Sequence, residues 1–143
     1  MPASRDQMLA VLKQRVVPNL RSRGFKGSMP HFRRADSNGI DLLTFQFDRH
    51  GGGFVVELAV CPADGFTLSW GEHVPASQVT AHHLTKRLRL GAVGKETDHW
   101  FRYDRRRWFS RSNAFERCAS DVLALLDSQG QTYWANERGK MTG

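Results

Sequence analysis

The stretch IDLLTFQFDRHGGGFVVELAVC, residues 40–61, contains two runs of apolar and β-branched residues on either side of a glycine triplet. Residues 40–47 and 54–61 are each long enough for a strand, and the glycines at 51–53 supply the backbone freedom that a chain reversal needs. The pattern predicts an antiparallel hairpin at the centre of one sheet.

The two runs alternate between apolar and more polar positions. In the first run Leu43, Phe45 and Phe47 share one face, while Thr44 and Gln46 share the other. In the second run one face carries Phe54, Val56, Leu58 and Val60, and the opposite face carries Val55, Glu57 and Ala59. Alternation of this kind predicts a sheet with one well-buried face.

Segments on either side extend this plan. Residues 31–35 lie before a turn signal at 36–39 and predict a third strand of a meander. An apolar face at helical spacing predicts an N-terminal helix that begins near residue 5 and ends at Gly24, and Pro18 should kink it or restart its final turn.

A second amphipathic stripe lies near the end of the chain and predicts a helix that ends near Gly130. Its members are Phe115, Cys118, Ala119, Val122, Leu123 and Leu126. Residues 62–86 are irregular, and residues 87–90 and 99–103 have patterns that would add strands.

The length of 143 residues fits one hydrophobic core. We therefore expect a single α+β domain at 1–130, in which an N-terminal and a C-terminal helix pack on an antiparallel sheet of about four or five strands. The polar composition of residues 131–143 predicts a flexible C-terminal tail.

The amino-acid composition indicates the kind of partner and the cellular compartment that we expect for this protein. Lysines and arginines number 21 against 14 aspartates and glutamates, which gives a net charge of +7 and favours acidic partners. No apolar run approaches the roughly 20 residues of a membrane helix, and the first residues lack a secretory pattern, so we expect a cytoplasmic protein without membrane contact. Cys61 and Cys118 lie in apolar stretches and are interpreted as buried, reduced thiols.

Several short segments occur in an order typical of one family. They are VPNL at 17–20, RGFK at 23–26, FRR at 32–34, FQ at 45–46, the run at 54–60, RLG at 89–91 and DHWF at 98–101. Over about residues 8–127 the chain resembles the bacterial family catalogued as domain of unknown function 4304. The resemblance implies the fold and a single domain, and it implies no activity.

The run RYDRRRWFSR at 102–111 interleaves arginines with aromatic residues. Arginines of this kind bind phosphates while neighbouring rings stack on bases, so four residues are candidates for anion or nucleic-acid binding: Arg105, Arg106, Arg107 and Arg111. A solvated basic turn, with Trp108 and Phe109 packed in the core, explains the same run.

No pattern points to catalysis, a metal or a cofactor. The six histidines lack metal-ligand spacing, and the adjacent His82 and His83 point in different directions in regular structure. The glycines at 51–53 lead into a strand, whereas a phosphate loop leads into a helix. Arg89 and Asp98 are expected to form an ion pair that holds the irregular segment, and Asp98→Ala should then lower the melting temperature.

Three functional hypotheses remain open. The first is a non-catalytic cytoplasmic binding module for an acidic protein or ligand, which agrees with the positive charge. The second is sequence-independent nucleic-acid binding through the arginine cluster at 105–111. The third is a small enzyme with a cleft between the sheet and residues 62–86. The sequence favours the first hypothesis over an enzyme, and it does not determine the oligomeric state.

Overall fold

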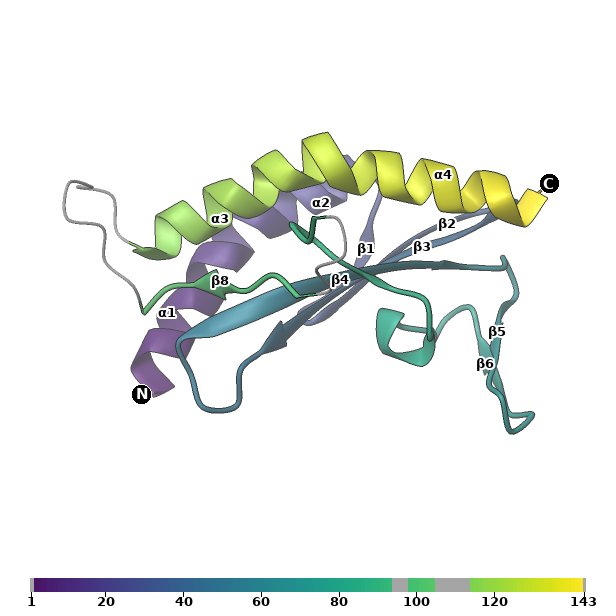
Figure 1. The fold of residues 1–143 in the computed structure, drawn as a ribbon, viewed down its shortest axis with the longest axis horizontal. Helices are drawn as coiled ribbons and strands as arrows, with labels where there is room; N and C mark the ends of the chain where they lie inside the picture. Colours follow the sequence, from purple (N-terminus) through teal and green to yellow (C-terminus); the bar gives the residue numbers. More distant parts are fainter. Residues whose placement is uncertain (1, 94–97, 105–113, 143) are drawn as a thin grey trace.

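The computed structural model describes residues 2–93, 98–104 and 114–142. The N-terminal and C-terminal helices lie together on one side of a twisted antiparallel sheet, and the segment between residues 62 and 86 lies on the other side (Figure 1). The expectation of an α+β fold with helices on the face of an antiparallel sheet is confirmed.

The N-terminal helix consists of three consecutive segments. They are α1 (Pro2–Val11), the π-helical turn η1 (Leu12–Val16) and α2 (Val17–Ser22). Pro18 lies in the first turn of α2, where its missing N–H costs little, so the restart expected at this proline is confirmed. The helix begins at Pro2, earlier than expected, because a proline is well tolerated at a helix start.

Gly24 ends the helix with a φ of +97°. Its N–H donates to the carbonyl of Arg21 at 3.0 Å, and the N–H of Phe25 donates to that of Leu20 at 3.0 Å. This pair of bonds is the Schellman arrangement that glycine permits. It turns the buried Phe25 into the core.

The main sheet has the strand order β1-β2-β3-β4-β7, and β8 also pairs with β4. The strands are β1 (Lys26–Ser28), β2 (His31–Asp36), β3 (Gly39–Phe47), β4 (Gly53–Cys61), β7 (Leu88–Arg89) and β8 (Phe101–Arg102). The predicted hairpin is confirmed: β3 and β4 pair from Phe47 with Phe54 to Ile40 with Cys61. Gly51 and Gly52 have φ angles of +87° and +88°, which explains the glycines in this turn.

The helical side of the sheet holds the main core. Helices α3 (Ala114–Leu125), η3 (Leu126–Gly130) and α4 (Gln131–Thr142) follow one another without a break. Their apolar stripe packs with the N-terminal helix on Leu43, Phe45, Phe54, Val56 and Leu58. Burial of the predicted stripe is confirmed for Cys118, Ala119, Val122 and Leu126.

The expectation of a flexible tail after residue 130 is wrong for residues 131–142, which are polar in composition but form the helix α4. Trp134 is only 1% exposed and packs against Phe25, with 4.9 Å between ring centroids. Gly130 does not end the helix. A Cβ there would lie 3.3 Å from the Leu126 side chain and at an ordinary contact distance of 3.6 Å from the Leu58 side chain on β4, so Gly130 lies against the sheet within a continuous helix.

The opposite face of the sheet is also buried, which corrects the expectation of one well-buried face. Residues 62–86 fold into β5 (Gly65–Thr67), β6 (His73–Pro75) and the 3-10 turn η2 (Ala81–His83). Apolar side chains of this segment cover Ile40, Leu42, Ala59 and Cys61. An apolar cluster therefore fills part of the space between the sheet and residues 62–86, where the enzyme hypothesis expected a cleft.

The two cysteines are free and buried on opposite sides of the sheet. Cys61 belongs to the cluster under residues 62–86, and Cys118 belongs to the main core. Burial raises the pKa of each thiol to about 11. None of the described helices combines the length and the apolar character needed to cross a membrane.

Candidate functional site

A buried carboxylate lies on each face of the sheet. Asp41 on β3 is 4% exposed and faces the helices, whereas Glu57 on β4 is 2% exposed and faces the other way. The two carboxylates do not pair, because side chains of a strand alternate between the two faces and the register places these two on opposite sides of the sheet. Each carboxylate has its own cationic partners.

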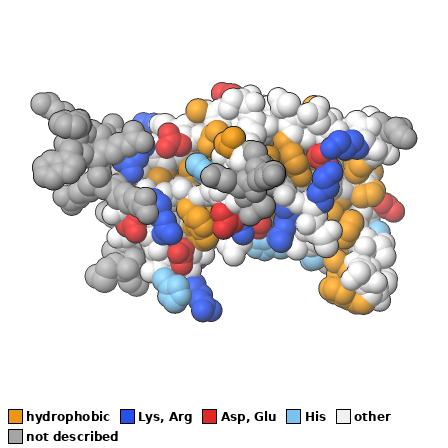
Figure 2. Space-filling view, in the orientation of Figure 1, with side chains coloured by type: hydrophobic (Ala, Val, Ile, Leu, Met, Phe, Trp, Pro, Cys, Tyr) orange, Lys and Arg blue, Asp and Glu red, His pale blue; other side chains and the backbone are white. Residues whose placement is uncertain are grey.

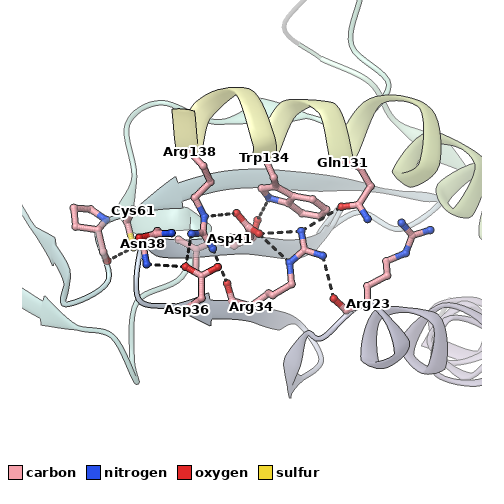
Figure 3. Close-up of polar contacts among 11 residues, drawn as sticks. Arg23, Arg34, Asp36, Asn38, Asp41, Cys61, Gln131, Trp134 and Arg138 are labelled. Atoms are coloured by element: carbon pink, nitrogen blue, oxygen red, sulfur yellow. Dashed lines mark hydrogen bonds and ion pairs between the residues drawn. The ribbon is translucent and has the colours of Figure 1, made fainter. Parts of the chain in front are cut away.

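The Asp41 cluster consists of Arg34, Asp36, Asp41 and Arg138, and it joins β2, β3 and α4 (Figure 3). Nε of Arg34 donates to Asp41 Oδ2 at 2.9 Å, and Nε of Arg138 donates to Asp41 Oδ1 at 2.9 Å. Arg138 also donates to Asp36 at 2.8 Å. Arg34 donates further to the carbonyl of Arg23 and to Gln131, and its guanidinium lies 4.6 Å from the centroid of the Phe25 ring.

The charges of the Asp41 cluster balance, because two arginines meet two aspartates. Its donors are engaged within the protein, and Trp134 adds a bond from Nε1 to the carbonyl of Leu42 at 3.3 Å. A cleft of about 540 Å³ opens beside the cluster, but no uncompensated charge faces it. We therefore interpret the Asp41 cluster as a structural cluster that attaches α4 to the sheet.

The Glu57 cluster begins as a row of polar residues across four strands. The pairing register sets His31 on β2 opposite Thr44 on β3, Thr44 opposite Glu57 on β4, and Glu57 opposite Arg89 on β7. The Thr44 hydroxyl and His31 Nδ1 are hydrogen-bonded at 2.8 Å. This row lies on the face away from the helices. Its register brings together residues that are far apart along the chain.

Three cationic or protonatable side chains meet the Glu57 carboxylate. His82 Nε2, from η2, lies 3.0 Å from Oε1, and Arg87 Nη1 lies 3.4 Å from the same oxygen. Arg89 Nε lies 3.2 Å from Oε2. The His82 ring also meets the His31 ring edge to face, with centroids 5.7 Å apart, so η2 closes over the polar row. The Glu57 cluster is defined as His31, Arg33, Thr44, Glu57, His82, Arg87 and Arg89.

Positive charge exceeds negative charge in this cluster. Arg33, Arg87 and Arg89 are three arginines, and among the described residues the carboxylates within ion-pair distance of Arg89 are Glu57 and the 66% exposed Asp98. Side-chain exposures of 41% for His82, 35% for Arg87 and 24% for Arg89 leave these three side chains in contact with solvent.

Two further observations concern β2. Nη2 of Arg33 donates to the carbonyl of Val79 at 2.9 Å, while its buried Nε has no hydrogen-bond acceptor among the described residues. Burial lowers the pKa of His31, and the nearby His82, Arg33 and His83 lower it further. His31 is therefore uncharged at neutral pH and bonds Thr44 as a neutral imidazole.

The structure describes some of the residues that the sequence analysis named as candidates, and others lie outside the described residues. Arg105, Arg106, Arg107 and Arg111 lie outside the described residues. The predicted ion pair between Arg89 and Asp98 is present at 3.2 Å, and the Arg89 guanidinium also lies 5.9 Å from the Trp100 ring centroid. Glu57 is the stronger partner of Arg89 because it is buried.

Sequence reasoning missed the Glu57 cluster. A signal was present, since Thr44 and Glu57 are polar residues inside the two most apolar runs of the chain. The loop between the runs did not specify which residues pair, so the row across the strands was not evident. His82 and Arg87 reach Glu57 only through the fold of residues 62–86.

The other described clefts and side-chain groups are weaker candidates for a functional site. A cleft of about 580 Å³ lies between α1 and the β3–β4 turn, where Arg5 and Arg49 are balanced by Asp6 and Asp48. Within residues 2–93, 98–104 and 114–142, no three histidine, cysteine, aspartate or glutamate side chains are grouped so as to hold a metal ion. The Glu57 cluster is thus the candidate functional site.

Comparison with known proteins identifies a family and no individual relative. Neither the curated proteins nor the solved structures include a significant match to this chain. One family model, described as a domain of unknown function, matches residues 16–133, which span β1 to β8, α3 and the start of α4. The chain belongs to the DUF4304 family.

Proposed function

We propose that this protein is a non-catalytic cytoplasmic binding module for an acidic protein, which it contacts through the Glu57 cluster. The observation that carries the proposal is the meeting of His82, Arg87 and Arg89 on one buried carboxylate. Glu57 holds these side chains in place, and their remaining charge faces solvent. Preorganised cations of this kind recognise carboxylate groups at low entropic cost.

The chemistry of the described nucleophiles supports a binding role. Thr44, the hydroxyl residue bonded to a histidine within the Glu57 cluster, is 0% exposed, so no substrate reaches it in this fold. Cys61 and Cys118 are buried, and their pKa values of about 11 keep both thiols protonated at neutral pH. Two free, buried thiols also agree with a reducing compartment.

The test uses a fluorescein-labelled peptide of twelve glutamates and measures fluorescence anisotropy at low ionic strength. The wild-type protein should bind this peptide, and the affinity should fall as salt is added because the contacts are ionic. Arg87→Glu should weaken binding about tenfold or more. Lys13→Glu, which makes the same charge change on exposed η1, serves as the matched control and should have a much smaller effect.

Two outcomes would contradict the proposal. One is the absence of salt-dependent binding to the peptide, and the other is an equal loss for Arg87→Glu and Lys13→Glu, which would indicate net charge alone. A labelled oligothymidine in the same assay distinguishes the nucleic-acid hypothesis: tighter binding to it than to the peptide at equal salt would favour that partner.

Identification of the natural partner follows by affinity capture and mass spectrometry. The informative proteins are those that the wild-type chain and Lys13→Glu retain and that Arg87→Glu loses. Such a set depends on the Glu57 cluster and not on total charge. Acidic proteins should dominate it.

A further inference from the structure

The hairpin of β5 and β6 carries an exposed tryptophan at its tip. Trp70 is 73% exposed, in a chain whose other described large apolar side chains are mostly buried. An indole in water is costly, because burying a tryptophan removes a large apolar area from solvent. Single exposed aliphatic residues are common on protein surfaces, but a tryptophan on a projecting turn calls for a physical reason.

The turn that carries Trp70 is tightly built. The N–H of Leu68 donates to the carbonyl of Glu72 at 2.8 Å, and the N–H of Gly71 donates to the carbonyl of Leu68 at 2.9 Å. Gly71 takes a φ of +97°, which a side chain would disfavour. Trp70 Nε1 lies 3.5 Å from Glu72 Oε1. The indole is therefore presented on an ordered support.

Side-chain contacts along β5 and β6 stabilise the hairpin as well. His73 Nε2 donates to the carbonyl of Asp64 at 2.9 Å, so its Nδ1 is free to accept the hydroxyl of Thr67 at 2.9 Å. Phe66 and Leu68 pack against the apolar cluster under the sheet. These contacts lower the entropy that the hairpin would lose on binding, which is the usual advantage of a preorganised anchor.

The hairpin and the Glu57 cluster lie on the same side of the molecule. Both β5–β6 and the segment around η2 lie on the face of the sheet away from α3 and α4 (Figure 1). In Figure 2, basic and histidine side chains lie along the lower middle of the molecule, and hydrophobic side chains gather at the lower right tip, where Figure 1 places the hairpin. One partner surface could therefore contact both.

We propose that Trp70 is the apolar anchor of the interface whose ionic part is the Glu57 cluster. The partner is an acidic protein with apolar residues beside its carboxylates, so that the indole is buried while the carboxylates meet Arg87 and Arg89. Charge complementarity with Arg87 and Arg89, on the same face of the sheet as the hairpin, selects this occupant. Buried tryptophans at interfaces contribute more to affinity than most other contacts. This inference rests on the proposed function.

The test adds a second labelled peptide, in which two central glutamates of the twelve are replaced by phenylalanine. The wild-type protein should bind it about fivefold more tightly than the all-glutamate peptide, because a ring packs against the indole. Trp70→Ala should abolish this preference and leave the affinity for the all-glutamate peptide unchanged. Val93→Ala is the matched control, since Val93 is 72% exposed, and it should keep the preference.

Each result has a distinct meaning. Salt-dependent binding of both peptides without a preference for phenylalanine, or a preference that survives in Trp70→Ala, would overturn the role of Trp70 and leave the proposed function standing. Binding of neither peptide would overturn both. A loss of preference in Val93→Ala equal to that in Trp70→Ala would also overturn the inference, because it would place the apolar contact elsewhere.

Discussion

Glu57 is the residue that holds the second face of the sheet together electrostatically. Its buried carboxylate accepts from Arg89 and Arg87 and contacts His82, so loss of its charge leaves three cationic or protonatable groups without their common anion. Removing one member of a buried charge cluster costs more than the pair itself contributes, because the remaining charges stay desolvated. These partners are partly exposed, which reduces the cost.

Glu57→Gln is expected to lower the free energy of unfolding by about 2 kcal/mol, measured by urea denaturation. Glu72→Gln is the matched control, because Glu72 is exposed on the hairpin tip, and it should change stability by no more than about 0.5 kcal/mol. Equal effects of the two substitutions would show that the carboxylate of Glu57 has no special structural role.

His31 makes stability depend on pH. Its pKa is lowered in the folded state, chiefly by burial, so the unfolded chain binds this proton more readily than the folded chain does. The contribution of the neutral imidazole is therefore complete above the ordinary histidine pKa of about 6.5 and is lost as the pH falls through that value toward the folded pKa. Stability falls with acidification in this window.

His31→Asn should reduce this dependence. Urea unfolding curves measured between pH 7.5 and pH 5 are expected to give a smaller loss of stability for the variant than for the wild-type protein. His50→Asn, at an exposed position in the β3–β4 turn, is the control and should follow the wild-type curve. Parallel curves for His31→Asn and the wild type would contradict the assignment to His31.

At the scale of elements, α4 belongs to the core although its composition is polar. Leu126, Gly130 and Trp134 continue the apolar stripe of α3 at intervals of four residues, which is the spacing of one helix face. Gly130 interrupts the apolar signal in the sequence, although it is itself buried and lies against Leu58 of β4. Arg138 then fastens the last turns through Asp41 and Asp36.

A chain that ends at Gly130 should therefore be much less stable than the full chain. It loses Trp134, and loss of a buried tryptophan side chain alone costs about 3–5 kcal/mol. A chain that ends at Lys140 keeps Trp134 and Arg138 and is expected to unfold within a few degrees of the full protein. Thermal unfolding followed by circular dichroism makes the comparison. Equal melting temperatures for the two truncations would show that α4 is dispensable.

At the scale of the whole molecule, the sheet separates the two cysteines. Cys61 and Cys118 lie in clusters on its opposite faces, so a disulfide between them would require a different fold. Burial raises the pKa of both thiols to about 11, and both should therefore react slowly with Ellman's reagent at pH 8. Labelling should accelerate at least about a hundredfold in denaturing urea, and a reductant should leave the melting temperature unchanged. Rapid labelling of either thiol in the native protein would contradict this burial.

The chain's local patterns were sufficient for the meander and for most of both helices. The alternation in β3 and β4, the glycines of their turn and the helical stripe near Cys118 are features of neighbouring residues, so periodicity along the chain reveals them. The β3–β4 pairing and the glycine cap at Gly24 were predicted for this reason. Residues 131–142 were not, because their few core side chains are diluted by polar ones.

The amino-acid sequence by itself determined the fold class, the central hairpin, the excess of positive charge and the family to which the chain belongs. Only the tertiary structure decided which charges meet. Arg138 reaches Asp41 across 97 residues, and Arg89 reaches Glu57 across 32. Such contacts depend on strand register and on how each layer packs, and neither follows from the periodicity of neighbouring residues. Trp70 lies in residues 62–86, which have no regular pattern in the sequence, and its exposure on a hairpin is evident only from the pairing of β5 and β6 in the fold.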